Sequence, residues 1–311
     1  MKLACMFPGQ GSQSIGMLKS IGESSDIIVK TFQEAQSVLN IDFWSMAQNG
    51  PESDLNDTIN TQVVMLISDV AMFRFLQAHG MPQPQMMAGH SLGEYAAMVA
   101  ANAIDFKDAV RLVRTRAELM TDAVRQEKGA MAAIIGLDNA VVEEICQKIV
   151  AQYPGKSLEA ANFNAPGQVV IAGHIELVEQ SLSEYEKAGA RMSKILPVSV
   201  PCHCRLMLPA AEKFYNVLES TPMNVPDFQL ISNVDVSIYD NVEKMKVLLS
   251  QQLYQSVQWT KTLEVFAQNQ VDLLVECGPG KVLCGLAKRT TPQINTVFCY
   301  EVNHLPQWDV V

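Results

Sequence analysis

Apolar and polar positions along the chain follow two different patterns. Short apolar runs bounded by glycine or proline, such as residues 3–7 before Pro8-Gly9, are typical of buried parallel strands. Longer stretches have apolar residues at helical spacing, at residues 25–39, 61–79, 92–101 and 106–125. A strand–turn–helix unit at residues 86–101 recurs at 271–288. Strands that alternate with helices predict a parallel-sheet α/β architecture.

The middle of the chain has a different order of elements. Strand patterns lie at residues 130–135, 158–163, 168–172 and 191–198, and helical patterns at 139–151 and 175–188. This order, βαββαβ, is that of the ferredoxin-like split motif. We therefore expect a catalytic core formed by residues 1–127 and 199–311, with an inserted ferredoxin-like subdomain at 128–198. The cleft between the two is the natural place for a site.

Composition and charge narrow the possible class of protein. With 311 residues, 48% of them hydrophobic and 18% charged, the chain can bury a large core. A net charge of −10 argues against a nucleic-acid partner. The seven cysteines have no regular spacing, the N-terminus lacks a signal-peptide pattern, and no apolar run reaches the ~18 residues of a membrane span. These features predict a cytoplasmic protein that does not contact a membrane.

The most informative motif is Gly89-His90-Ser91-Leu92-Gly93, which fits G-x-S-x-G. In α/β enzymes this pattern places a nucleophilic serine on a tight turn between a strand and a helix. The apolar residues on both sides of the motif suit such a strand and helix. The alternative is a glycine-flanked turn with a purely structural role.

A nucleophilic Ser91 needs a general base, and His203 is the best-placed histidine. It comes directly after the point where the chain returns from the predicted subdomain to the core. The other four are placed less well. His79 lies near a helix end, His90 is next to Ser91 in sequence so that its side chain should point elsewhere, His174 lies at a strand end, and His304 lies in a polar tail. Cys202-His203-Cys204 could also suggest zinc. However, the spacing is too short for a structural zinc site, and a strand-like stretch would place the cysteines and His203 on opposite faces. We therefore expect no metal.

Two further residues could bind charge. Arg116 falls in the middle of the apolar face of its predicted helix, where a guanidinium needs an anionic partner. That partner could be a carboxylate of the protein or a carboxylate of the substrate. Gln10, in a glycine-rich turn, could donate to a developing oxyanion together with the backbone N–H of Leu92, although alone it would be an ordinary turn residue.

Together, several motifs resemble one enzyme family. They occur in order as residues 7–13 (FPGQGSQ), 89–95 (GHSLGEY), Arg116, 198–203 (VSVPCH), 252–254 (QLY) and 257–259 (VQW). From residue 3 to about residue 290 the chain is similar to the malonyl-CoA:acyl-carrier-protein transacylases of bacterial fatty acid synthesis. Such an ordered set is far more specific than G-x-S-x-G alone. The sequence departs from the family's usual residues at Cys202, Cys204 and Ser256, which affects the expected pocket wall.

The resemblance implies a role for each matching residue. Ser91 would be the acylated nucleophile and His203 its general base and acid. Gln10 and the Leu92 N–H would form the oxyanion hole, and Arg116 would bind the malonyl carboxylate. The backbone carbonyl of Gln252 would orient His203. The family's fold is an α/β-hydrolase-like core with a ferredoxin-like subdomain, which agrees with the division of the chain predicted above.

The resemblance also implies a reaction and its partners. We expect ping-pong transfer of malonyl from malonyl-CoA to the phosphopantetheine thiol of acyl carrier protein, by a monomer that uses no cofactor. Docking of an acidic carrier would need local cations near the cleft, and Arg191, Lys194, Arg205 and Lys281 are candidates. The alternatives are an acyltransferase of a polyketide pathway, a serine thioesterase or hydrolase, and a non-catalytic carrier-binding protein that keeps the fold.

Overall fold

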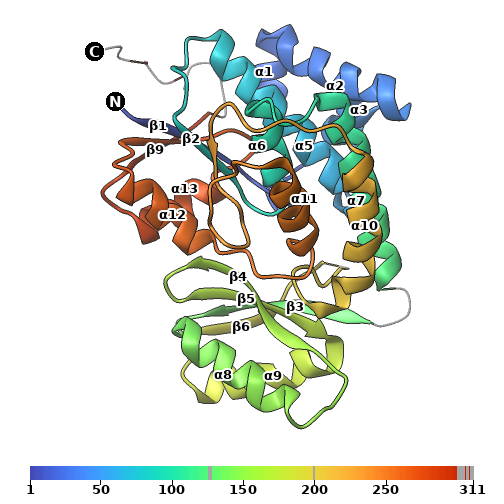
Figure 1. The fold of residues 1–311 in the computed structure, drawn as a ribbon, viewed down its shortest axis with the longest axis vertical. Helices are drawn as coiled ribbons and strands as arrows, with labels where there is room; N and C mark the ends of the chain where they lie inside the picture. The colour runs from blue at the N-terminus through green and yellow to red at the C-terminus, as the bar shows by residue number, and fades with distance from the viewer. Residues whose placement is uncertain (125–127, 199, 300–304, 306–307, 309–311) are drawn as a thin grey trace.

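The computed structural model describes residues 1–124, 128–198, 200–299, 305 and 308. The expected domain boundaries at residues 127 and 199, and His304, lie outside the described residues. Figure 1 shows a larger part built around one sheet and a smaller part that carries α8 and α9. The two sheets are separate: one has five strands and the other four. The predicted combination of a parallel α/β sheet with a second unit in the middle of the chain is therefore confirmed.

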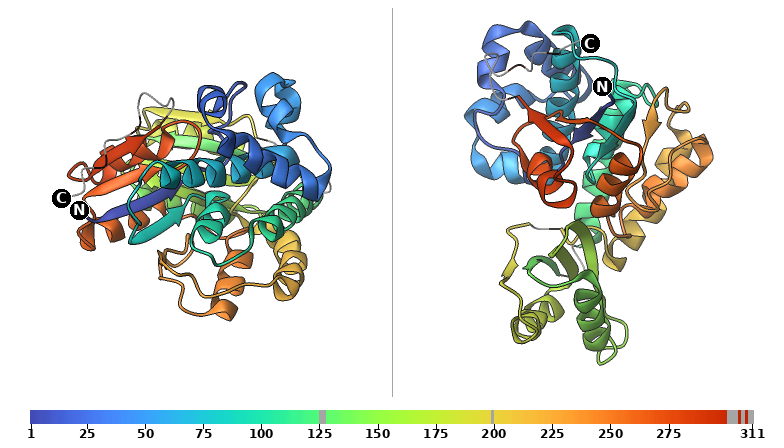
Figure 2. Two further views of the ribbon diagram at one scale, coloured as in Figure 1. Left: turned by 90° about the horizontal axis from the view of Figure 1, so that it is seen from above. Right: turned by 90° about the vertical axis from the view of Figure 1, so that its left-hand side faces the viewer.

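The larger part is built on a sheet in the order β7-β2-β1-β8-β9, in which each strand is parallel to its neighbours. The strands are β1 (Leu3–Phe7), β2 (Met86–Gly89), β7 (Gln229–Leu230), β8 (Leu273–Glu276) and β9 (Asn295–Phe298). Every residue of the three central strands, β2, β1 and β8, is buried. Apart from Glu276 at the end of β8, these strands consist of apolar residues, because helices cover both faces of the sheet (Figure 2).

Helices pack around this sheet. Those before the second unit are α1 (Lys19–Ser24), α2 (Asp26–Leu39), α3 (Phe43–Asn49), α4 (Glu52–Asn56), α5 (Thr58–Ala78), α6 (Gly93–Ala100) and α7 (Phe106–Ala123). Those after it are α10 (Leu208–Ser220), α11 (Val242–Gln251), α12 (Trp259–Gln268) and α13 (Val282–Thr290), with a short 3₁₀ helix, η1 (Arg205–Met207), before α10. Among the described residues, α5 alone is long and apolar enough to cross a membrane. However, 83% of its most apolar window is buried inside the protein, as expected of a core helix.

The smaller part has the element order βαββαβ. Its elements are β3 (Gly129–Ile135), α8 (Asn139–Val150), β4 (Leu158–Ala165), β5 (Gln168–His174), α9 (Ile175–Lys187) and β6 (Met192–Ile195). The strands form an antiparallel sheet in the order β4-β5-β3-β6. Figure 1 shows α8 and α9 on the side of this sheet that faces away from the larger part. β4 is joined to the larger part through Val257, whose N–H and carbonyl bond to Ala161 O and Phe163 N, both at 2.9 Å.

Some element boundaries differ from the prediction for identifiable reasons. α5 begins at Thr58, three residues before the predicted start, because the Asp57 side chain accepts a hydrogen bond from Ile59 N and caps the helix. β6 ends at Ile195 and not at residue 198, because Pro197 cannot donate to a strand ladder. The helices and strands that the apolar pattern did not reveal are α1, α3, α4, α10, α11, α12, β7 and β9.

Candidate active site

Ser91 lies on a sharp turn between β2 and α6. Its backbone has a positive φ of 52°, a conformation that costs a non-glycine residue about 1–3 kcal/mol. The turn needs glycine on both sides: a Cβ at Gly89 would lie 1.9 Å from the carbonyl carbon of Gly93, and a Cβ at Gly93 would lie 2.0 Å from Phe7 O. Asn233 holds the strained turn, since its Oδ1 accepts from Ser91 N at 2.7 Å. The G-x-S-x-G motif therefore forms the predicted strand-to-helix elbow.

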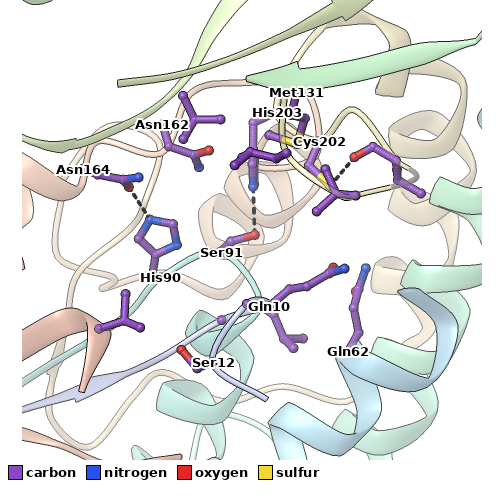
Figure 3. Close-up of a pocket in the computed structure, with 18 of the residues that line it drawn as sticks. Gln10, Ser12, Gln62, His90, Ser91, Met131, Asn162, Asn164, Cys202 and His203 are labelled. Atoms are coloured by element: carbon purple, nitrogen blue, oxygen red, sulfur yellow. Dashed lines mark hydrogen bonds between the residues drawn. The ribbon is translucent and has the colours of Figure 1, made fainter. Parts of the chain in front are cut away.

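The structure brings His203 to this serine across 112 residues of sequence. Ser91 Oγ and His203 Nε2 are 2.8 Å apart (Figure 3). His203 Nδ1 lies 2.6 Å from the backbone carbonyl of Gln252, which can only accept, so Nδ1 carries the proton and Nε2 is free to accept one. Burial, followed by the nearby Arg116 charge, lowers the pKa of His203 to about 3. The imidazole is therefore neutral at neutral pH, as a general base must be.

Arg116 projects from α7 into the same site and is only 1% exposed. Its Nη1 donates to Gln62 Oε1 at 2.5 Å and its Nη2 to Gln252 Oε1 at 2.9 Å, and Nη2 also lies 3.5 Å from Ser91 Oγ. Within the described part of the chain, no carboxylate lies within 4.0 Å of the guanidinium. The structure thus gives Arg116 two neutral amide partners and leaves its charge available to a ligand.

A pocket of about 240 Å³ opens above Ser91, between the two parts of the molecule. One wall comes from the larger part and includes Gln10, Arg116 and His203, while the other comes from the smaller part and includes Asn162 and Leu196. Figure 3 shows the Ser91–His203 pair in the middle of the pocket residues, with Gln10 and Gln62 on one side of Ser91 and Asn162 and Asn164 on the other. A site in the cleft between core and insert is what the sequence led us to expect.

The two expected oxyanion donors also reach this pocket. Gln10 and Leu92 line it, and the Gln10 amide makes a long hydrogen bond to Thr58 Oγ1 at 3.4 Å. The loop that carries Gln10 lies against the elbow, since a Cβ on Gly9 would be 2.5 Å from His90 O and 3.8 Å from Leu92 N. The loop that carries Gln10 is therefore in close contact with the backbone at Leu92.

Several buried polar residues of the site, among them Gln62, Glu94 and Asn233, were not singled out by sequence reasoning. Gln62, on α5, holds Arg116 as described above. Glu94, in the first turn of α6, is 0% exposed and accepts from Tyr239 Oη at 2.7 Å and from Gln252 Nε2. Burial raises the pKa of Glu94 to about 7, although its hydrogen bonds with Tyr239 and Gln252 oppose the shift. For Glu94 the available signal was a single charged residue in the otherwise apolar α6, whereas Gln62 lies at the polar start of α5 and gave no such signal.

The other histidines that the structure describes, His79, His90 and His174, lie away from the nucleophile's hydroxyl. His90 Nε2 bonds to Asn164 Oδ1 at 2.8 Å, so the residue next to Ser91 in sequence points toward the smaller part, as expected (Figure 3). Burial lowers the pKa of His90, which favours its neutral form. His79 is exposed at the end of α5, and His174 is buried in the smaller part.

The Cys202-His203-Cys204 segment is a turn and not the strand-like stretch that the sequence suggested. His203 has a φ of 62°, and the segment follows Pro201, which favours a turn. Cys202 lines the pocket, and burial raises the pKa of its thiol to about 11. Cys204 donates to Pro201 O at 3.2 Å. In the described ranges, no group of three or more His, Cys, Asp or Glu residues could hold a metal ion.

The four candidate docking cations are exposed. Arg191 directly precedes the edge strand β6, Lys194 lies on that strand, and Lys281 directly precedes α13. Arg205 forms an ion pair with Glu159 at 3.0 Å, so its charge is partly satisfied within the protein.

Comparison with known proteins places this arrangement in a family. The acyl transferase domain family matches residues 5–304. The malonyl CoA-acyl carrier protein transacylase of Escherichia coli K12 is 48% identical over 93% of this chain and 92% of its own length. The enzyme of the same name from Bacillus subtilis is 38% identical over 95% and 92%.

Solved structures agree with the sequence relatives. An acyl carrier protein S-malonyltransferase from Vibrio cholerae superposes with a TM-score of 0.94 at 44% identity, over 98% of this chain and 99% of that one. A malonyl-transacylase solved in complex with a type II polyketide acyl-carrier protein superposes with a TM-score of 0.95, also at 44% identity, over 98% of each chain. The chain therefore belongs to the acyl transferase domain family and, within it, to the malonyl CoA-acyl carrier protein transacylases.

Proposed function

We propose that this protein transfers the malonyl group from malonyl-CoA to the phosphopantetheine thiol of acyl carrier protein in fatty acid biosynthesis. The observation that carries the proposal is one buried constellation: a serine–histidine pair at 2.8 Å with a guanidinium 3.5 Å from the serine hydroxyl. The serine and histidine suit acyl transfer, and the guanidinium suits an acyl group that ends in a carboxylate. The names of the relatives point to the same reaction.

In the first half-reaction, Ser91 Oγ attacks the thioester carbonyl of malonyl-CoA while its proton passes to His203 Nε2. The Leu92 N–H and the Gln10 amide stabilise the oxyanion, at about 3–4 kcal/mol per donor. The carbon–sulfur bond then breaks, and His203 returns the proton to the departing thiolate. The products are free CoA and a malonyl ester of Ser91.

In the second half-reaction, the phosphopantetheine thiol gives its proton to His203 Nε2 and attacks the ester carbonyl. Ser91 Oγ leaves with that proton and the malonyl thioester of the carrier forms. Arg116 binds the free carboxylate in both halves, which selects malonyl over acetyl and holds the acyl group in place. The Gln252 carbonyl keeps His203 in the required tautomer, so the pair works as a dyad without an acidic third member.

The proposal also covers the domain architecture, the cofactor requirement, the cellular location and the partner. We propose that residues 1–127 and 199–311 form an α/β-hydrolase-like core and residues 128–198 a ferredoxin-like subdomain, which the strand order β4-β5-β3-β6 supports. The proposed chemistry uses only groups of the protein, so it calls for no cofactor. We further propose that the protein is a cytoplasmic monomer with acyl carrier protein as its partner.

The acceptor distinguishes the proposed function from its nearest alternative. The similarity to a transacylase solved with a polyketide acyl-carrier protein favours a polyketide pathway as the second candidate. We propose Arg191, Lys194, Arg205 and Lys281 as cations that could meet an acidic carrier of either kind.

One experiment separates these possibilities. The purified protein is mixed with malonyl-CoA and with a fatty acid carrier, a polyketide carrier or no acceptor, and the release of CoA and the loading of carrier are measured. The proposal predicts parallel lines in double-reciprocal plots and fastest loading of the fatty acid carrier. CoA release that is equally fast without an acceptor would instead identify a hydrolase.

A further inference from the structure

Gln252 lies at the centre of the site and contacts the histidine, the arginine and the serine turn. Its backbone carbonyl accepts from His203 Nδ1 at 2.6 Å, its Oε1 accepts from Arg116 Nη2 at 2.9 Å, and its Nε2 donates to the backbone carbonyl of Ser91 at 2.9 Å. The residue is 0% exposed, so water cannot replace these partners. The orientation of this one amide therefore affects the base, the guanidinium and the elbow together.

The amide can be placed in two ways that exchange its oxygen and nitrogen. In the observed orientation the oxygen faces the Arg116 donor, and the nitrogen faces two acceptors, Ser91 O and Glu94 Oε2. The reverse orientation would place an NH₂ against the guanidinium and an oxygen against a carbonyl and a carboxylate. The Glu94 carboxylate therefore selects the orientation that holds Arg116.

Glu94 is itself held firmly. Its Oε1 accepts from Tyr239 Oη at 2.7 Å and from Asn233 N at 3.3 Å, while Oε2 faces Gln252. Its position in the first turn of α6 also favours a negative charge, because the N-terminal end of a helix dipole is positive. A buried carboxylate with this many donors has a fixed place and a fixed direction.

The arrangement keeps opposite charges close without pairing them. Arg116 is bound to Glu94 only through the Gln252 amide, and the attraction between the two charges still lowers the cost of burying Glu94. A direct ion pair would occupy the planar fork of Arg116, whereas two neutral amides leave it able to bind a substrate carboxylate. Through the Gln252 amide, Glu94 thus orients the Arg116 guanidinium, and the guanidinium can still bind a ligand.

We propose that Glu94 is a positioning residue for acyl selection: through the Gln252 amide, its carboxylate fixes the Arg116 guanidinium in the orientation that recognises a carboxylated acyl group. This inference rests on the proposed function, because it assigns a role in malonyl recognition. Glu94 does not touch the acyl group, so its effect must appear as a change of preference between malonyl and acetyl groups.

The test is Glu94→Gln, which keeps the shape and removes the charge. The rates of Ser91 acylation by malonyl-CoA and by acetyl-CoA are measured for this variant and the wild type. Loss of one hydrogen bond to a charged group predicts a fall of about tenfold or more in the malonyl-to-acetyl preference. Glu118→Gln is the matched control, since Glu118 is a half-exposed carboxylate on α7 that pairs with Arg114, and it should leave the preference unchanged.

A pH profile adds a readout that a merely structural role would not move. The titratable and charged groups around Glu94 are Tyr239, Tyr95 and Arg116, and both tyrosines have raised pKa values, so Glu94 is the group among them that titrates near neutral pH. In the wild type the malonyl-to-acetyl preference should rise with pH through about 7, and in Glu94→Gln it should be flat. Titration of His203 acts on both acyl groups and cancels in the ratio.

The outcomes separate this inference from the proposed function. Equal losses for the two acyl groups, or an unchanged preference, would overturn the role of Glu94 while leaving the transferase intact. A wild-type protein that transfers no malonyl would instead overturn the proposed function. If Glu94→Gln shows no cooperative thermal unfolding, the malonyl-to-acetyl preference is measured for Tyr239→Phe instead. That variant removes one donor to Glu94 and should lower the preference about threefold, whereas no change would overturn the inference.

Discussion

Arg116→Ala removes a guanidinium that lies 3.5 Å from the nucleophilic hydroxyl. If this group binds the malonyl carboxylate, the variant should lose malonyl transfer and gain relative acetyl transfer. Acetyl has no carboxylate, so its transfer gains nothing from Arg116. The prediction therefore concerns the ratio between the two substrates more than either rate alone.

The expected size follows from the contacts that the guanidinium can make. A planar fork that grips a carboxylate makes two hydrogen bonds to a charged group, each worth about 1.5–3 kcal/mol. Their loss amounts to about 3–6 kcal/mol, or roughly 10²- to 10⁴-fold in malonyl kcat/KM relative to acetyl. The variant also leaves Gln62 Oε1 and Gln252 Oε1 without their donor, at about 1–3 kcal/mol of folding stability each.

The assay measures kcat/KM for malonyl-CoA and acetyl-CoA with the same carrier, after circular dichroism has shown that each variant is folded. Arg111→Ala is the matched control, because Arg111 lies on the same helix but is exposed and pairs with Asp108. Arg116→Lys keeps the charge without the fork and should give an intermediate ratio. An unchanged malonyl-to-acetyl ratio in Arg116→Ala would refute the assignment.

Two further predictions concern stability. The pKa of His203 is about 3 in the folded protein and about 6.5 in the unfolded chain, so the unfolded chain takes up a proton at a higher pH. Neutral His203 therefore contributes to the free energy of unfolding above about pH 6.5, and this contribution is lost as the pH falls toward 3. In urea titrations, wild type should lose about 2 kcal/mol more than His203→Gln between pH 7.5 and pH 5, and equal losses would contradict this account. Gly93→Ala should destabilise by about 3 kcal/mol or more, because its Cβ would lie 2.0 Å from Phe7 O. Gly285→Ala, in open space on α13, should be neutral or stabilising by up to about 1 kcal/mol, and similar losses in both variants would show that the close approach at Gly93 is not the cause.

The elements that the sequence predicted are those with strong local signals. The apolar run of residues 3–7 became β1, and the G-x-S-x-G motif became the elbow at Ser91. The burial of Arg116 followed from helical periodicity, because one charged residue on an apolar face is visible in the sequence. Some elements that escaped prediction, such as the two-residue β7 and the five-residue α4, are too short to show a period. Length does not explain why α10, α11 and α12 were missed, since they have 13, 10 and 10 residues.

The contacts that complete the site depend on long-range packing. Gln62 and Glu94 meet Arg116 and Gln252 across separations of 54 and 158 residues, which no local pattern can reveal. The turn at His203 was misread because Cys202-His203-Cys204 has no glycine to mark its positive φ. The sequence can show that a residue such as Glu94 is unusual on its helix, but it cannot show which residues it contacts.

The proposed mechanism requires Ser91 to carry the malonyl group between donor and acceptor. Intact-protein mass spectrometry after brief mixing with malonyl-CoA, followed by peptide mapping, tests it most directly. We expect a single malonyl adduct on Ser91 that disappears when the carrier thiol is added and does not form in Ser91→Ala. An adduct on another residue, or transfer to the carrier without any adduct, would contradict it.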